Sequence, residues 1–188
     1  MVHSIVRGAV FALLAVRADA EIDFTPKESF YLAETTRVPC VAFHNDHKEM
    51  SYTPPLGWTL SGGGRKITLT PPAKVQAGAT MQTEPVSEPL PATEQNLQAY
   101  ADLAVKELPR EASKITVAEA VICPLRISKR TMAEVTLTYV LFGQQFTANI
   151  LFLPYDKEQI TFQVTARNAD FAPLAKVFRA SLYSLQGL

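Results

Sequence analysis

The residues best suited to bind a metal ion lie close together near the N-terminus. Cys40, His44 and His47 follow one another within eight residues, with Asp46 and Glu49 beside them. Thiolate sulfur and imidazole nitrogen are ligands that zinc prefers. The spacing, however, matches neither a zinc finger nor the HExxH helix. Two interpretations stay open, a metal or small-ligand carrier that uses this segment and a polar loop before the first strand. We favour the loop and assign no metal and no cofactor.

The chain has two cysteines, Cys40 and Cys123. Two thiols are too few for a disulfide scaffold or for a zinc site made of four thiolates. An oxidising compartment would allow them to pair, and the disulfide would then close a loop of about 80 residues, worth about 4 to 5 kcal/mol in the chain-entropy model. The alternative is two buried thiols. The sequence leaves both open because it does not give the Cα separation that a disulfide requires.

The sequence lacks the motifs of nucleophilic and phosphate chemistry. It has no GxSxG nucleophile elbow, and nothing in the spacing places a serine or cysteine beside a histidine. The segment SGGGRK at 61–66 differs from a P-loop, which needs GxxxxGK followed by a helix. Because residues typical of strands flank these glycines, we predict a hairpin turn there. We assign no catalytic residue and expect a protein that is not an enzyme. A hydrolase with a dispersed site remains the alternative.

One small basic cluster stands out from an otherwise balanced charge. Arg126, Lys129 and Arg130 lie between two predicted strands, where they could bind an anion or form a solvated loop. The whole chain has 18 basic and 18 acidic residues and a formal net charge of zero. A protein that binds nucleic acid by neutralising phosphates carries a positive excess. We therefore expect no nucleic-acid partner.

Residues 1–20 have the composition of a secretory signal peptide. Arg7 precedes an apolar run over 8–16, and Ala18-Asp19-Ala20 has the small-x-small pattern of a cleavage site. An apolar run of this length extends about 14 Å as a helix, whereas the core of a bilayer is about 30 Å thick. We expect cleavage near Ala20 and a mature chain that is periplasmic or extracellular. We expect no transmembrane segment in that mature chain, since no later apolar stretch is long enough.

Strand patterns dominate the rest of the chain. Residues 21–51 show no sustained period, so we expect a poorly defined N-terminal arm with one short strand over 38–43. Beyond it, the patterns predict strands at 58–61, 65–70, 79–86, 115–123, 131–141, 146–152 and 160–166. The last three alternate apolar and polar residues and are joined by short turns, which is typical of an antiparallel meander.

Two helices are expected beside these strands. The first has apolar residues at helical spacing up to Leu108, with Thr93 as its N-cap and Pro109 after its end. The second has Asp170 as its N-cap and an apolar stripe made of Phe171, Leu174, Phe178, Leu182 and Leu185. Each helix has one face to pack on a sheet. We therefore predict an α+β fold, an antiparallel β-sheet packed by helices, in a single domain over 52–188.

Three segments carry a resemblance to a known fold. They are PPLGWTL at 54–60, NLQAYADLAVKEL at 96–108 and QITFQVTARNADFAPLAKVFRASLYSL at 159–185. Together they resemble the PsbP/Mog1-like fold, an αβα sandwich that also occurs in small exported bacterial domains of uncharacterised function. The resemblance covers about residues 52–186 and implies a role in binding or assembly without catalysis. The best-known members serve photosystem II or a nuclear GTPase, and neither target carries over to this sequence. We expect an exported domain that binds a protein or envelope partner.

Overall fold

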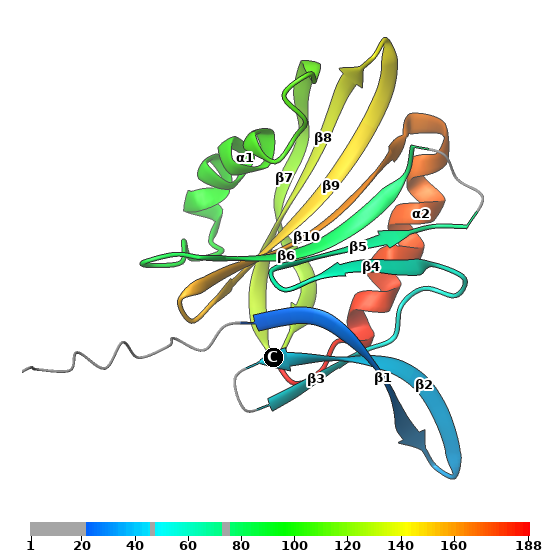
Figure 1. Ribbon diagram of the computed structural model, residues 1–188. Helices are drawn as coiled ribbons and strands as arrows, with labels where there is room; N and C mark the ends of the chain where they lie inside the picture. The colour runs from blue at the N-terminus through cyan, green and yellow to red at the C-terminus, as the bar shows by residue number, and fades with distance from the viewer. Residues whose placement is uncertain (1–21, 46–47, 73–75) are drawn as a thin grey trace, which may run out of the picture.

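The computed structural model describes residues 22–45, 48–72 and 76–188, so the predicted signal peptide lies outside the described residues. Within these ranges the chain forms two antiparallel sheets and two α-helices (Figure 1). The α+β fold predicted from the sequence is confirmed. None of the helices in these ranges is long and apolar enough to cross a membrane.

The large sheet has seven strands in the order β4-β5-β6-β10-β9-β8-β7. Their bounds are β4 Thr59–Gly63, β5 Lys66–Thr70, β6 Gly78–Pro85, β7 Ser113–Ile127, β8 Arg130–Leu141, β9 Gln144–Tyr155 and β10 Glu158–Arg167. The strands β8, β9 and β10 form the predicted meander, in which Val135 pairs with Ile150 and Ile150 pairs with Gln163. The hairpin predicted at the glycines is also confirmed, with its turn at 64–65 between β4 and β5.

The two helices lie on opposite faces of the large sheet, as the αβα sandwich requires. The helix α1 (Leu97–Lys106) packs over β7 and β8, and α2 (Asn168–Ser181) packs over β9 and β10. Thr93 precedes a 3₁₀ turn over Glu94–Asn96, and its side chain makes no capping hydrogen bond. Asp170 lies in the first turn of α2 rather than at its N-cap, which is Arg167. A carboxylate in that turn still interacts favourably with the helix dipole.

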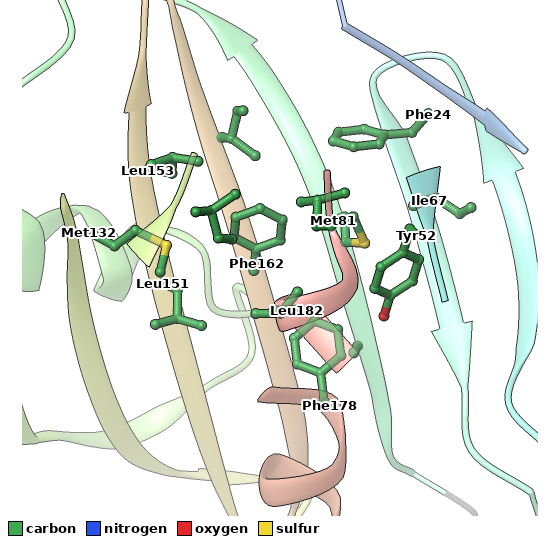
Figure 2. Close-up of a cluster of buried hydrophobic side chains, with 14 of the residues drawn as sticks. Phe24, Tyr52, Ile67, Met81, Met132, Leu151, Leu153, Phe162, Phe178 and Leu182 are labelled. Atoms are coloured by element: carbon green, nitrogen blue, oxygen red, sulfur yellow. The ribbon is translucent and has the colours of Figure 1, made fainter. Parts of the chain in front are cut away.

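The main core lies between the large sheet and α2. Alternate residues of β9 and β10 face it, and the stripe predicted for the second helix enters it through Leu185 and through Phe178 and Leu182 (Figure 2). Figure 2 also shows side chains from β1, β3 and β5, namely Phe24, Tyr52 and Ile67, in the same cluster. Burial of each such side chain stabilises the fold by about 1.5 to 3 kcal/mol. This core therefore joins the large sheet to the N-terminal strands.

The expectation of an irregular arm over 21–51 is corrected by the structure. This segment forms a second antiparallel sheet of β1 (Ile22–Ala33), β2 (Thr36–Asn45) and β3 (Lys48–Tyr52). The period-2 pattern is absent for two physical reasons. A register shift interrupts β1 between Asp23 and Lys27, and Ala42 and Phe43 are neighbours on β2 that are both buried. Simple alternation of apolar and polar residues cannot appear in such strands.

Candidate functional site

A groove of about 510 Å³ lies beside α1 on its face of the large sheet. The helix has ten residues, so it extends about 15 Å and cannot cover all seven strands. Pro109, which follows the end of the helix, lines the groove together with residues of β5, β6 and β10. The groove exists because this helix is short.

Most of the floor of the groove consists of small or neutral polar side chains. Thr68, Thr80 and Gln163 form one row across β5, β6 and β10 because they pair in register. Gly78 and Thr165 form the next row. Short side chains leave the floor low, and the Gln163 Nε2 atom donates a hydrogen bond of 3.1 Å to the Thr165 hydroxyl. The floor thus offers hydroxyl and amide groups, together with the ammonium group of Lys66, which lies on the same face of β5 as Thr68 and also lines the groove.

The wall of the groove is aromatic and comes from the β8–β9 hairpin. The rings of Tyr139 and Phe146 stack with their centroids 5.7 Å apart. Burial raises the pKa of Tyr139, against the effect of its hydrogen bond with Thr165. This hydroxyl is therefore neutral at physiological pH. The wall presents an apolar edge to any molecule that lies on the polar floor.

Phe142 lies at the rim of the groove and is 82% exposed. It occupies the turn between β8 and β9, where its φ is 49° and that of Gly143 is 75°. Two successive positive φ angles are the pattern of a type I′ turn, which favours Asn-Gly. A bulky side chain in the left-handed region costs about 1 to 2 kcal/mol, and such strain tends to occur at functional sites. An exposed aromatic ring is thus held beside an aromatic wall at a conformational cost.

Glu107 lies at the C-terminus of α1 and lines the groove. Its Oε2 atom accepts a hydrogen bond of 2.8 Å from Gln82 Nε2 on β6. Burial raises the pKa of Glu107, and the charge of Glu84 adds to this, while Gln82 and Lys66 oppose it. The described residues that line the groove include no Ser, Cys or His. The lining is suited to holding a molecule by stacking and hydrogen bonds.

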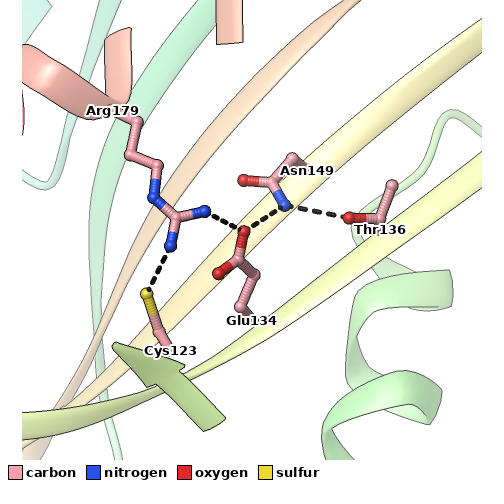
Figure 3. A network of polar contacts seen from close by, with 5 residues as sticks. All are labelled: Cys123, Glu134, Thr136, Asn149 and Arg179. Carbon is pink, nitrogen blue, oxygen red and sulfur yellow. Dashed lines mark hydrogen bonds and ion pairs between the residues drawn. The ribbon is translucent and has the colours of Figure 1, made fainter. Parts of the chain in front are cut away.

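A second polar cluster lies on the opposite face of the sheet, beneath α2 (Figure 3). Arg179 of α2 contacts the buried Glu134 of β8, with the Nη1 and Oε1 atoms 2.5 Å apart. Asn149 donates hydrogen bonds of 3.0 Å to Glu134 and to Thr136. Glu134 is 7% exposed, so these partners replace the water that its buried carboxylate has lost. The cluster fixes α2 to the sheet.

Cys123 belongs to this cluster, because its sulfur lies 3.3 Å from Arg179 Nη2. Burial raises the pKa of Cys123 to about 11. The residue is therefore a thiol at neutral pH, and a thiolate is the form that attacks substrates or binds metals. Cys40 is also buried, on β2. Both cysteines are free in the structure.

The candidate metal ligands are not brought together as a set. Cys40 and His44 both lie on β2, four residues apart. An extended chain separates such residues by about 13 Å, too far to share a metal ion. Cys40 is buried, His44 is exposed, and His47 lies outside the described residues. Among the residues that the structure describes, no three side chains of His, Cys, Asp or Glu form a metal-binding group.

The structure places the three residues of the predicted anion site in different surroundings. Arg130 donates a hydrogen bond of 2.8 Å to Asp156, and its guanidinium lies over the ring of Tyr155, 4.4 Å from the centroid. Arg126 is exposed on β7, and Lys129 lies in the β7–β8 turn with a φ of 65°. Arg130 therefore already has a carboxylate partner.

Sequence reasoning missed the groove and the buried cluster. The residues of the groove come from β5, β6, α1 and three later strands, and no local motif links them. One local signal was available, since Phe142 precedes Gly143 in a two-residue turn where asparagine is usual. Glu134 gave no signal, because a glutamate in an alternating strand is typical of a solvated face.

No protein-family model matches the sequence, and no curated protein matches it. Two solved structures are similar. One is the solution structure of PsbP from the cyanobacterium Synechocystis sp. PCC 6803, with a TM-score of 0.47, 10% identity and coverage of 95% of this chain and 99% of that chain. The other is the crystal structure of a protein of unknown function from Pseudomonas aeruginosa, with a TM-score of 0.45, 9% identity and coverage of 85% and 96%. The similarity to the PsbP fold predicted from the sequence is found, and it concerns the fold alone.

Proposed function

We propose that this protein is an exported, non-catalytic domain that holds part of a protein or envelope partner in the groove beside α1. The observation that carries the proposal is the groove itself, with an aromatic wall, a floor of hydroxyl and amide groups, and the charged residues Lys66 and Glu107 in its lining. Such a lining binds apolar groups by contact and orients them through a few hydrogen bonds. The volume of about 510 Å³ is suited to a small molecule or to a few residues of a partner chain.

The chemistry of the groove supports binding more than catalysis. Acid–base and nucleophilic mechanisms need two groups within hydrogen-bond reach of each other, with one of them activated. The shifted groups in the lining are Glu107 and Tyr139, and burial raises the pKa of both. A tyrosine with a raised pKa is a poor base at neutral pH. The composition of residues 1–20 supports the exported location.

The first experiment locates the partner by photocrosslinking in intact cells of the host. A photoreactive phenylalanine replaces Phe142 at the rim of the groove in one variant, and Leu56, which is 99% exposed, in the other. The proposal predicts a discrete adduct from the Phe142 position in the exported fraction and none from the Leu56 position. Identical adducts from both positions, or none from the first, would contradict it.

A second measurement tests whether the groove holds the partner. Thr80→Trp places a large ring on the floor, whereas Thr116→Trp places the same ring at an exposed position of β7 outside the groove. Adduct formation through the Phe142 position should be lost in the first variant and kept in the second. Intact mass of the purified protein tests export separately, because cleavage near Ala20 shortens the chain by its first twenty residues.

A further inference from the structure

The strands β1 and β2 extend beyond the rest of the molecule as a two-stranded arm. The strand β3 pairs with β2 only from Val41 to Asn45. Outward of Val41, β1 and β2 pair with each other alone, from Glu28 opposite Val41 to Ala33 opposite Thr36. Figure 1 shows this hairpin projecting from the body of the protein. We call residues 28–33 and 36–41 the β1–β2 arm.

The β1–β2 arm carries three consecutive large apolar residues that are exposed to solvent. Phe30 is 50% exposed, Tyr31 is 45% exposed and Leu32 is 65% exposed. Phe30 and Leu32 lie on one face of the arm, because alternate residues of a strand share a face. A hairpin of two strands is only marginally stable in water without a further packing surface. The face that carries Phe30 and Leu32, which we call the Phe30 face, is therefore an exposed apolar surface of the kind that marks an interaction site.

The Phe30 face carries one negative and one positive residue, so the faces of two copies of the chain can be complementary in charge. Glu28 lies at the base of this face, and Arg37, the cross-strand partner of Leu32, lies near its outer end. The Arg37 guanidinium lies 4.4 Å from the centroid of the Phe30 ring. When two arms pack face to face in opposite directions around a two-fold axis at Phe30, Arg37 of each arm comes level with Glu28 of the other. A two-fold interface is self-complementary in this way.

We propose that two copies of this chain associate through the Phe30 faces of their β1–β2 arms. Phe30 and Leu32 of each copy pack against those of the other, and Arg37 of one copy pairs with Glu28 of its partner. The opposite direction of the two arms keeps the two globular bodies at opposite ends of the contact. This association uses a surface that is separate from the groove, since no residue of the arm lines the groove.

The shape of the β1–β2 arm favours a protein partner over a lipid surface. A hairpin that enters a bilayer does so with an apolar tip, because polar groups in hydrocarbon are costly. Here the turn at the tip is formed by Glu34 and Thr35, and the apolar side chains lie along the flat of the arm. Side-by-side packing of two arms covers these side chains and leaves both tips in water.

The size of the surface predicts how strong the association is. Six residues of strand extend about 20 Å, and two strands with their side chains are about 10 Å wide. Two such faces together have an area of only about 400 Å², well below the roughly 1,200 Å² or more of stable protein interfaces, so the contact can support only a weak and transient association. We therefore expect a monomer–dimer equilibrium with a dissociation constant in the micromolar range or above.

Sedimentation equilibrium from low micromolar to millimolar concentration tests the proposal with protein purified from its host. The wild type should show reversible dimerisation. The variant F30S/L32S should weaken it by about tenfold or more, because two buried apolar side chains are lost. The matched control L56S/V177S removes two exposed apolar side chains elsewhere and should leave the association constant unchanged.

A charge exchange tests the geometry of the contact. Glu28→Arg and Arg37→Glu should each weaken association, and the double variant E28R/R37E should recover most of the loss. A protein that stays monomeric at millimolar concentration, or dimers that F30S/L32S leaves intact, would overturn the proposal. Flotation with anionic phospholipid vesicles tests the alternative that the arm binds a lipid surface rather than a second copy of the chain. Vesicle binding by a monomer that F30S/L32S abolishes would assign the arm to lipid instead.

Discussion

The two faces of the large sheet are covered in different ways, although the same strands form both. On one face α2, the 3₁₀ turn Leu182–Ser184 and the small sheet together enclose one continuous core. The end of the chain completes this cover, since Ser51 and Gln186 exchange backbone hydrogen bonds. On the other face α1 is the main cover, and it leaves the groove open.

The difference shows how one sheet can provide stability and binding at once. The closed face buries large side chains and an ion pair, so we expect substitutions there to act on the free energy of unfolding. The floor of the groove on the open face carries mostly short polar side chains whose exchange creates no cavity. We expect substitutions there to act on binding, because a site can change without loss of the core.

The largest effect is expected at Phe178 on the closed face. This residue is 1% exposed, and its ring stacks on Trp58 with the centroids 6.3 Å apart. Phe178→Ala removes most of a buried aromatic side chain, which costs about 3 to 5 kcal/mol. Urea unfolding measures the change, with Val177→Ala as the matched control because Val177 is 45% exposed. A loss below about 1 kcal/mol would mean that α2 does not close this face.

The second prediction concerns the ion pair beneath α2. Arg179→Met leaves the buried Glu134 carboxylate without its cation, and because the Arg179 side chain is 33% exposed, we expect a cost at the lower end for a buried pair, about 3 kcal/mol or less. Glu134→Gln alone should also destabilise the protein. The double variant should lose less than the sum of the two, because the uncompensated charge is gone. Additive losses in a urea double-mutant cycle would show that the two residues act independently.

The sequence predicted the parts of this fold that depend on local periodicity. The β8–β10 meander and the stripe through Phe178 and Leu182 follow patterns that a few neighbouring residues establish. The small sheet could not be predicted, because the bulge in β1 and the exposed β1–β2 arm remove the alternation. Such strands are specified by their partners rather than by their own pattern.

The sites were harder to predict than the fold. The groove depends on where α1 ends relative to β6 and β10, and this is a tertiary property. The sequence predicts that the helix ends at Leu108 before Pro109, whereas α1 ends at Lys106. The sequence also does not give the width of the sheet beyond the helix. The pair of Arg179 and Glu134 joins residues 45 positions apart, and only the packing of α2 reveals it.

A moderate effect is expected from Tyr100, beneath α1 on the partly open face. Tyr100 is fully buried, its hydroxyl donates a hydrogen bond to the Leu90 carbonyl, and burial raises its pKa to about 12. Tyr100→Phe keeps the ring contact with Phe152 but leaves that carbonyl unsatisfied, at a cost of about 1 to 2 kcal/mol. Tyr183→Phe at a 69% exposed position is the control for urea unfolding. Equal stability of both variants would contradict the role of this bond in holding α1.

The smallest effect is expected at Glu107, where the groove meets α1, and it is recognised by its pH dependence. Because burial raises the pKa of Glu107 in the folded protein, the folded state binds more protons than the unfolded state above the unfolded pKa of about 4.3. The contribution of this group to the free energy of unfolding is therefore fully present below that pH and is lost as the pH rises through the folded pKa.

Glu107→Gln removes this pH dependence, while the amide oxygen of the new side chain can still accept the hydrogen bond from Gln82 Nε2. The two proteins should have similar stability at pH 4, and the variant should be equal or slightly more stable at pH 7, by less than about 1 kcal/mol for a half-exposed group. Urea unfolding across this pH range measures the difference, and a variant that is markedly less stable at pH 7 would mean that the charged carboxylate holds the end of α1 in place.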